Sequence, residues 1–128
     1  MKPLTTQEII KQAVGNQGDW KQVYQAVYST IQNNTHRVFR HGDTLVWVKL
    51  LPNKKAEMFV FTADKEKEAV GNLAECLKAV IASGFQEIYF DAPYEDAFEF
   101  LEPMGFQVDS APAERGYRGV IRGLVESV

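Results

Sequence analysis

The chain has 128 residues, of which 45% are apolar and 24% are charged, with a net charge of −3 and a pI near 5.4. These values predict one globular domain over residues 1–128 and argue against disorder. The acidic balance argues against a nucleic-acid partner, no apolar run is long enough for a membrane span, and the single cysteine excludes an intrachain disulfide. Because residues 1–10 do not resemble a signal peptide, we expect a soluble protein of the cytoplasm.

Two helices are predicted in the first quarter of the chain. The first runs from a Thr5 cap to Gly15, and residues 2–5 before it are a candidate for a short first strand. The second begins after Asp19, because apolar residues recur at helical spacing as far as Ile31. We expect the aromatic residues of this stripe to lie in the core: Trp20, Tyr24 and Tyr28.

The middle of the chain has the pattern of β-strands. Residues 36–40, 44–51 and 56–63 are rich in β-branched and aromatic residues, and only short turns separate them, at residues 41–43 and 52–55. Short connections place successive strands side by side in opposite directions. The sequence therefore predicts a three-stranded antiparallel meander.

A helix and a buried strand are predicted next. An apolar stripe from Ala69 to Ile81 indicates a helix, and Gly84 supplies its C-terminal cap. Residues 86–92 follow directly and are mostly apolar. We therefore expect this strand to join the central sheet, with the helix packed against it.

The last third of the chain is predicted to contain one more helix and two strands. Pro93 suits the first turn of a helix, which we expect to end at Gly105. The two strands are predicted over residues 106–111 and 117–125. The expected class is therefore α/β (α+β), with helices packed on both faces of a mixed central sheet.

Two stretches in the C-terminal half carry a family pattern. "ASGFQEIYFDA" (residues 82–92) joins a helix end to a buried strand, and "AFEFLEPMGF" (97–106) is similar to the signature A-x-x-F-Y-E-K-L-G-F. Together they resemble the GNAT N-acetyltransferase superfamily, and the expected element order matches over nearly the whole chain. The resemblance implies a GNAT-like fold in the order (β)-α-α-β-β-β-α-β-α-β-β.

The resemblance also implies where a cofactor would bind. Family members hold acyl-CoA in the splay between the fourth and fifth strands, with its pyrophosphate on backbone N–H groups of a loop written Q/R-x-x-G-x-G/A. Residues 64–69 occupy that loop here, with Asp64 in the Gln/Arg slot, and a frame shifted to Gly71 does not restore the motif. Lys65, Lys67 and Gly71 are the cofactor-binding candidates. Because carboxylates would lie beside a pyrophosphate, we expect no cofactor and a solvated first helical turn.

The family signature also includes a residue for proton transfer. Many members use the Tyr of F-Y-E-K-L-G-F as a general acid, but Leu101 occupies that slot here and Pro103 replaces the Lys. Leucine cannot donate a proton. The remaining catalytic candidates are Tyr94, at the far end of the predicted helix, and Glu57, at the start of its strand. We therefore expect no acyl transfer.

Other polar residues are possible ligands. His36 and His41 lack the partners of a metal site, so we expect turn residues and no metal. Acidic residues from Asp91 to Glu102 are favoured in the first turns of a helix and are expected to solvate it. Asp91 alone lies at a strand end, where ligand sites often occur.

Two arginines and the cysteine complete the candidates. Arg118 and Arg122 share one face of the last strand, where they are expected to protect an exposed sheet edge, with contact to a partner or a phosphate as the alternative. Cys76 lies in a predicted helix with no neighbouring histidine to activate it. We expect a buried structural thiol and not a nucleophile.

The resulting hypothesis is a catalytically degenerate GNAT-like protein that acts through contacts with other proteins. It resembles small GNAT-like proteins of tailed-phage virion and morphogenesis modules, which implies virion proteins as partners and the virion as a second location. The alternative is a divergent acyl-CoA-dependent N-acetyltransferase that uses acetyl-CoA through an unusual loop over residues 64–71. A third hypothesis is a small-ligand or peptide binder that reuses the strand splay. No nucleic-acid or membrane partner is expected.

Overall fold

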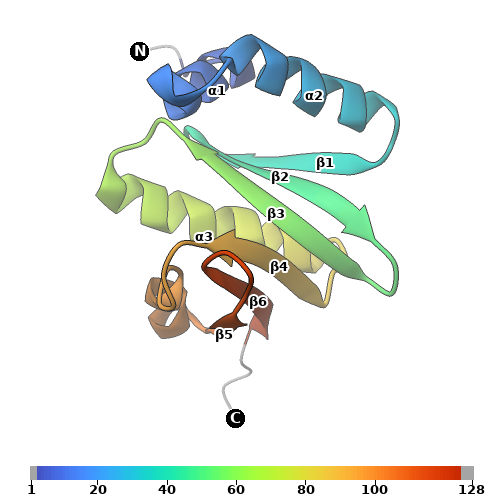
Figure 1. Ribbon diagram of the computed structural model, residues 1–128, viewed down its shortest axis with the longest axis vertical. Helices are drawn as coiled ribbons and strands as arrows, with labels where there is room; N and C mark the ends of the chain where they lie inside the picture. Colours follow the sequence, from blue (N-terminus) through green and yellow to red (C-terminus); the bar gives the residue numbers. More distant parts are fainter. Residues whose placement is uncertain (1–2, 125–128) are drawn as a thin grey trace.

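The computed structural model describes residues 3–124, which form helices on both faces of one central sheet (Figure 1). The helices and strands follow in the order α1 (Thr6–Val14), 3-10 helix η1 (Gly15–Gln17), α2 (Trp20–Gln32), β1 (His36–His41), β2 (Thr44–Leu51), β3 (Lys55–Thr62), α3 (Glu66–Ala82), β4 (Glu87–Ala92), 3-10 helix η2 (Glu99–Met104), β5 (Phe106–Pro112) and β6 (Tyr117–Leu124). The mixed α/β class is confirmed.

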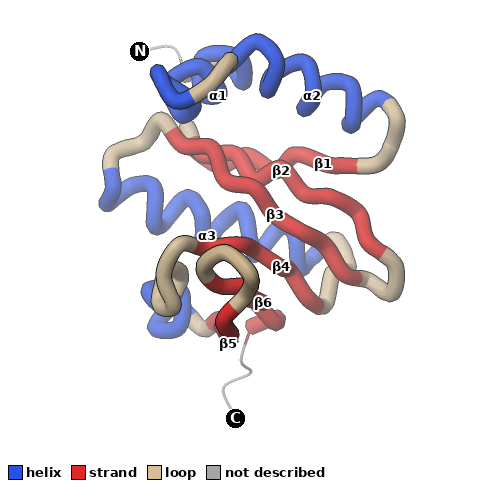
Figure 2. The backbone as a smooth tube through the Cα atoms, viewed as in Figure 1, coloured by secondary structure: helices blue, strands red, loops and turns tan. Residues whose placement is uncertain are grey.

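The six strands are ordered β1-β2-β3-β4-β6-β5 across the sheet. β1, β2 and β3 form the predicted antiparallel meander, and β6 pairs antiparallel with both of its neighbours, β4 and β5. Only β3 and β4 are parallel, because α3 carries the chain back across the sheet between them. The sheet therefore consists of two antiparallel halves that meet at one parallel pair. Figure 2 shows its strands in red and the helices in blue.

Side chains of alternate strand residues enter two separate cores. Ile9 of α1 and Val27 of α2 pack with Leu45 on one face of the sheet. On the other face, Leu77 of α3 packs with Val46 in a larger core that also includes β4 and β6. Burial of each such side chain contributes about 1.5–3 kcal/mol. Successive side chains of β2 point to opposite faces of the sheet, and this alternation places α1 and α2 on one face and α3 on the other.

Capping residues define the helix ends as predicted. The Thr5 side chain accepts a hydrogen bond from the Glu8 amide at 3.1 Å, and the Glu8 carboxylate accepts one from the Thr5 amide at 3.0 Å. Asp19 caps α2 by accepting from the amide of Lys21 at 3.1 Å. Gly84 follows the end of α3 with a φ of 107°, which favours glycine. The Thr5 and Asp19 caps satisfy N–H groups at the helix starts, and the Gly84 amide donates to the Ile81 carbonyl at the end of α3.

The predicted α-helix over residues 93–105 is wrong. This segment consists of turns followed by the 3-10 helix Glu99–Met104. Pro103 has no N–H, and its ring clashes with the carbonyl four residues earlier, so an α-helix cannot continue through it. The chain instead forms i→i+3 bonds, such as that from the Leu101 amide to the Phe98 carbonyl at 3.1 Å.

The N-terminal region departs from the predictions in two respects. Residues 3–5 are not a strand, and they lead directly into α1. In α2 the expected core aromatic Tyr28 is 55% exposed, and Ile31 is 40% exposed. The apolar stripe of α2 is wider than the contact that α2 makes with β1 and α1, so its outer residues remain in solvent. Trp20 and Tyr24 are half-buried.

The last strand is not the predicted sheet edge. β6 lies between β4 and β5, so Arg118 and Arg122 project from an interior strand. Arg122 forms an ion pair with Asp109 across to β5. The predicted end of this strand at Val125 lies outside the described residues. Within residues 3–124, no helix is both long enough and apolar enough to cross a membrane.

Candidate functional site

β3 and β4 are paired over only three residues, and their separation creates the candidate site. The register runs from Lys55–Glu87 to Glu57–Tyr89, and the strands diverge beyond it (Figure 1). A cavity of about 360 Å³ lies in this opening, and a second cavity of about 570 Å³ lies against α3. Val60 lines both. The two cavities therefore adjoin at β3.

Aromatic side chains line the β4 side of the opening. Phe98 packs edge-on against Phe90 with ring centroids 4.5 Å apart, and the Phe100 ring lies 5.9 Å from that of Phe98. The Phe90 ring rests on Gly119 of β6, where any Cβ atom would overlap it. Such aromatic pairs contribute about 0.5–1.5 kcal/mol beyond the burial of their area. Aromatic packing thus holds the segment that replaces the predicted α-helix.

Asp64 lies between β3 and α3, in the slot where the family motif has Gln or Arg. Its Oδ2 atom accepts three hydrogen bonds, from the Asp43 amide at 3.1 Å, the Thr44 hydroxyl at 2.8 Å and the Asn72 amide group at 2.8 Å. Asn72 also bonds to His41 at 2.8 Å. Within residues 3–124, Oδ1 of Asp64 accepts no hydrogen bond, and Asp64 lines the cavity against α3. The carboxylate therefore joins the turn after β1 to Asn72, in the second turn of α3.

The first turn of α3 contains the residues that a pyrophosphate would meet. Glu66 and Glu68 lie in this turn, and the candidates Lys65 and Lys67 are exposed beside them. Gly71 lies inside α3, and a Cβ atom added there would meet nothing within 4 Å. Contacts within the protein therefore do not require a glycine here, and Gly71 lines a cavity of about 620 Å³ beside the first turn of α3. The acids at the helix start are favoured there by the helix dipole.

The candidates for proton transfer lie on different faces of the sheet. Leu101, in the slot of the catalytic Tyr, is fully buried. Tyr94 is 57% exposed and lines the cavity against α3. Glu57 instead projects from the opposite face, where its carboxylate lies 2.5 Å from the Arg118 guanidinium. The structure therefore does not bring Tyr94 and Glu57 together.

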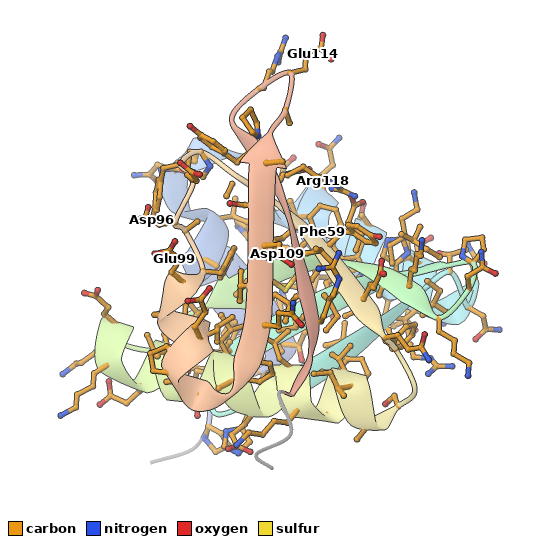
Figure 3. All side chains as sticks on the ribbon, turned by 90° about the horizontal axis from the view of Figure 1, so that it is seen from below. Phe59, Asp96, Glu99, Asp109, Glu114 and Arg118 are labelled. Carbon is orange, nitrogen blue, oxygen red and sulfur yellow. The ribbon has the colours of Figure 1, made fainter. Side chains whose placement is uncertain are left out.

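Arg118 is the centre of a charged cluster on the open face of β4 and β6. Besides Glu57, it contacts Asp91 at 3.0 Å, and it lies over the Tyr89 ring at 5.4 Å. Burial lowers the pKa of Arg118, but the bonds to Asp91 and Glu57 outweigh it and raise the pKa above its ordinary value. Figure 3 shows Arg118 and Phe59 on the same side of the β5–β6 hairpin.

Sequence reasoning missed this cluster because it depends on strand register. Asp91 and Arg118 are paired directly across β4 and β6, although 27 positions separate them in the chain. The sequence signal that indicates such a cluster is the presence of charged residues at alternate positions of β4 and β6, strands that are otherwise mostly apolar. The cluster also holds the Glu57 carboxylate in an ion pair with Arg118.

The histidines and the cysteine have structural surroundings. The His36 ring stacks on Trp47 with centroids 4.7 Å apart, and burial is the main cause that lowers its pKa. Cys76 is buried, as predicted, with its sulfur 3.7 Å from the Phe39 and Thr44 carbonyls. Burial raises the pKa of this thiol to about 11. A thiol that stays protonated is a poor nucleophile.

Comparison with solved structures identifies the fold. No protein-family model matches the sequence, and no curated protein matches it. Among solved structures, an aminoglycoside 6'-acetyltransferase type Ii matches with a TM-score of 0.65 and 11% identity, over 95% of this chain and 89% of that one. A Bacillus subtilis acetyltransferase in complex with CoA matches with a TM-score of 0.58 and 8% identity, over 97% and 96%.

A third similar structure names the superfamily. A GNAT superfamily phosphinothricin acetyltransferase from Sinorhizobium meliloti, in complex with AcCoA, matches with a TM-score of 0.55 and 15% identity, over 93% of this chain and 81% of that one. Identities this low establish similarity of fold alone. The chain has the fold of the GNAT-superfamily acetyltransferases.

Proposed function

We propose that this protein uses the GNAT fold as a binding scaffold, does not transfer acetyl groups from CoA, and acts through contacts with another protein. The main support is Asp64, a carboxylate held by three hydrogen bonds in the slot of the family's Gln or Arg. An anion-binding loop needs hydrogen-bond donors that converge on the phosphates. A fixed carboxylate at that position repels the phosphate groups, because both carry negative charge. The burial of Leu101 in the slot of the proton donor supports the same conclusion.

The alternative is a divergent acyl-CoA-dependent N-acetyltransferase. Its support is the similarity of fold to acetyltransferases in complex with CoA and AcCoA, together with the retained opening between β3 and β4. In that case Lys65 and Lys67 would have to compensate for the carboxylates at the start of α3. The phage virion or morphogenesis setting, with virion proteins as partners, remains a prediction from the sequence resemblance alone.

Thermal unfolding with and without acetyl-CoA separates the two functions. A ligand present at 100 times its dissociation constant stabilises a protein by about 2.7 kcal/mol. We expect the melting temperature to be unchanged at millimolar acetyl-CoA. A clear increase with acetyl-CoA that Lys67→Glu weakens would contradict the proposal and favour the enzyme.

A further inference from the structure

An exposed apolar groove runs between the first half of α3 and the segment before β5. The cavity against α3 is lined by Tyr94 and Phe100, which are 57% and 38% exposed. A neighbouring cavity of about 620 Å³ is lined by Met104, which is 39% exposed, and it shares Glu66 and Val70 with the first. Three of the six exposed large apolar side chains among the described residues therefore border this groove. Such clustering is typical of a binding surface.

The rim of the groove is acidic. Residues 64–68 and 95–102 together contain seven carboxylates and only two lysines. Of these charged residues, Glu66 lines both cavities, Asp64 lines the first and Lys67 lines the second, whereas the acids of residues 95–102 lie on the adjoining segment. In Figure 3, Asp96 and Glu99 project from the second segment on the side of the molecule where α3 begins. An apolar floor with carboxylates around it favours an occupant that is both apolar and cationic.

The walls of the groove are held in place by contacts of their own. η2 packs against α3 and β5, and Ser110 of β5 donates a hydrogen bond to the Glu95 carbonyl at 2.7 Å. Phe98 anchors the same segment to Phe90 from inside. A groove that exists before binding loses little conformational entropy when a partner docks.

We propose that this groove binds a segment of a partner protein in which Lys or Arg residues accompany apolar side chains. The apolar side chains contact Tyr94, Phe100 and Met104, and the cationic groups pair with Glu66 and the acids of residues 95–102. This inference rests on the proposed function, because it assigns to a protein segment a region that acyl-CoA would occupy in an enzyme of this fold.

Selection from an mRNA-displayed library of random 12-residue peptides on the immobilised full chain tests this inference. We expect the recovered peptides to combine a net positive charge with apolar residues. Synthetic copies should bind at least tenfold more weakly to Phe100→Ser and to Glu66→Lys, and binding should also weaken when NaCl is raised from about 50 to about 500 mM. Circular dichroism melting of each variant verifies that it is folded.

Matched variants away from the groove serve as controls. Tyr28→Ser removes an aromatic residue that is 55% exposed on α2, and Glu114→Lys reverses a charge at the tip of the β5–β6 hairpin (Figure 3). Both should bind the peptides like the unaltered chain. The inference is wrong if no peptide is enriched, if the peptides are neutral or acidic, or if groove and control variants bind equally.

Two further outcomes identify other occupants. A dimer in sedimentation that Phe100→Ser abolishes would assign the groove to a second copy of this chain and overturn the inference. Titration of the same preparation with CoA keeps the two proposals distinct. CoA binding overturns the proposed function, whereas absence of both CoA and peptide binding overturns only the inference.

Discussion

Asp64 is a single carboxylate that joins the turn after β1 to Asn72 of α3. Thr44, one of its donors, is fully buried, and the Thr44 hydroxyl also bonds to Thr62 at 2.7 Å. A buried donor that loses its acceptor still carries the full free-energy cost of desolvation, without a hydrogen bond to offset it. The residue in the slot of the family's Gln or Arg is therefore also one that stabilises the fold.

Replacement of this carboxylate should destabilise the protein. We expect Asp64→Ala to lower the free energy of unfolding by about 2–3 kcal/mol, because it removes the acceptor of three hydrogen bonds and leaves the backbone amide of Asp43 and the side-chain amide of Asn72 unpaired. Urea unfolding followed by circular dichroism measures this change. Asp96→Ala, which removes an exposed carboxylate, should stay within about 0.5 kcal/mol. Equal effects of the two changes would show that the network contributes little.

Cys76 predicts a specific pH dependence of stability. Its pKa is raised to about 11 in the folded protein from an ordinary 9.0, because burial disfavours the thiolate. The unfolded chain therefore loses this proton first as the pH rises, and folding loses stability between about pH 9 and 11. The stability advantage of the unaltered chain over Cys76→Ala should shrink by roughly 1–2 kcal/mol from pH 7.5 to 10.5. A constant difference in urea unfolding would contradict this expectation.

At the scale of elements, α3 retains a glycine that neither packing nor backbone conformation requires. Gly71 has space for a methyl group, and alanine is favoured over glycine inside a helix. We expect Gly71→Ala to raise the free energy of unfolding by about 0.5–1 kcal/mol. Gly84→Ala is the matched control. It also meets no atom, but its φ of 107° strains alanine, so it should destabilise by about 1 kcal/mol or more.

Calorimetric melting of both glycine variants measures these opposite effects. Destabilisation by Gly71→Ala would mean that this glycine has a packing or ligand role that the contacts of α3 do not reveal.

Most helices and strands could be predicted from apolar periodicity and turn residues. The caps Thr5 and Asp19 and the meander over residues 36–63 depend on neighbours in the chain, so the sequence alone specifies them. The segment over residues 93–105 departs from the predicted α-helix because its apolar spacing is helical, whereas Pro103 prevents the α-helical bonds around it. Tyr28 was misplaced because periodicity indicates which face of a helix is apolar but not how much of that face is covered.

At the scale of the whole molecule, the site depends on contacts that the sequence does not specify. Asp64 was predicted to oppose a pyrophosphate, but its bonds to Asp43 and Thr44 require the β2–β3 register. The pairing of Arg118 with Glu57 likewise requires β6 to be an interior strand of the sheet. The family signature indicated the fold because its apolar residues serve packing. Chemistry depends on the polar positions, and these differ here.

The central claim is that a GNAT fold is present here without binding of acyl-CoA. An NMR titration of the ¹⁵N-labelled chain with CoA tests it most directly, because it observes the amides of residues 65–69 at the start of α3 and of residues 58–61 in the opening. We predict no saturable shift in either group at millimolar CoA. Saturable shifts of both groups, with a common dissociation constant, would contradict the account and establish a cofactor site.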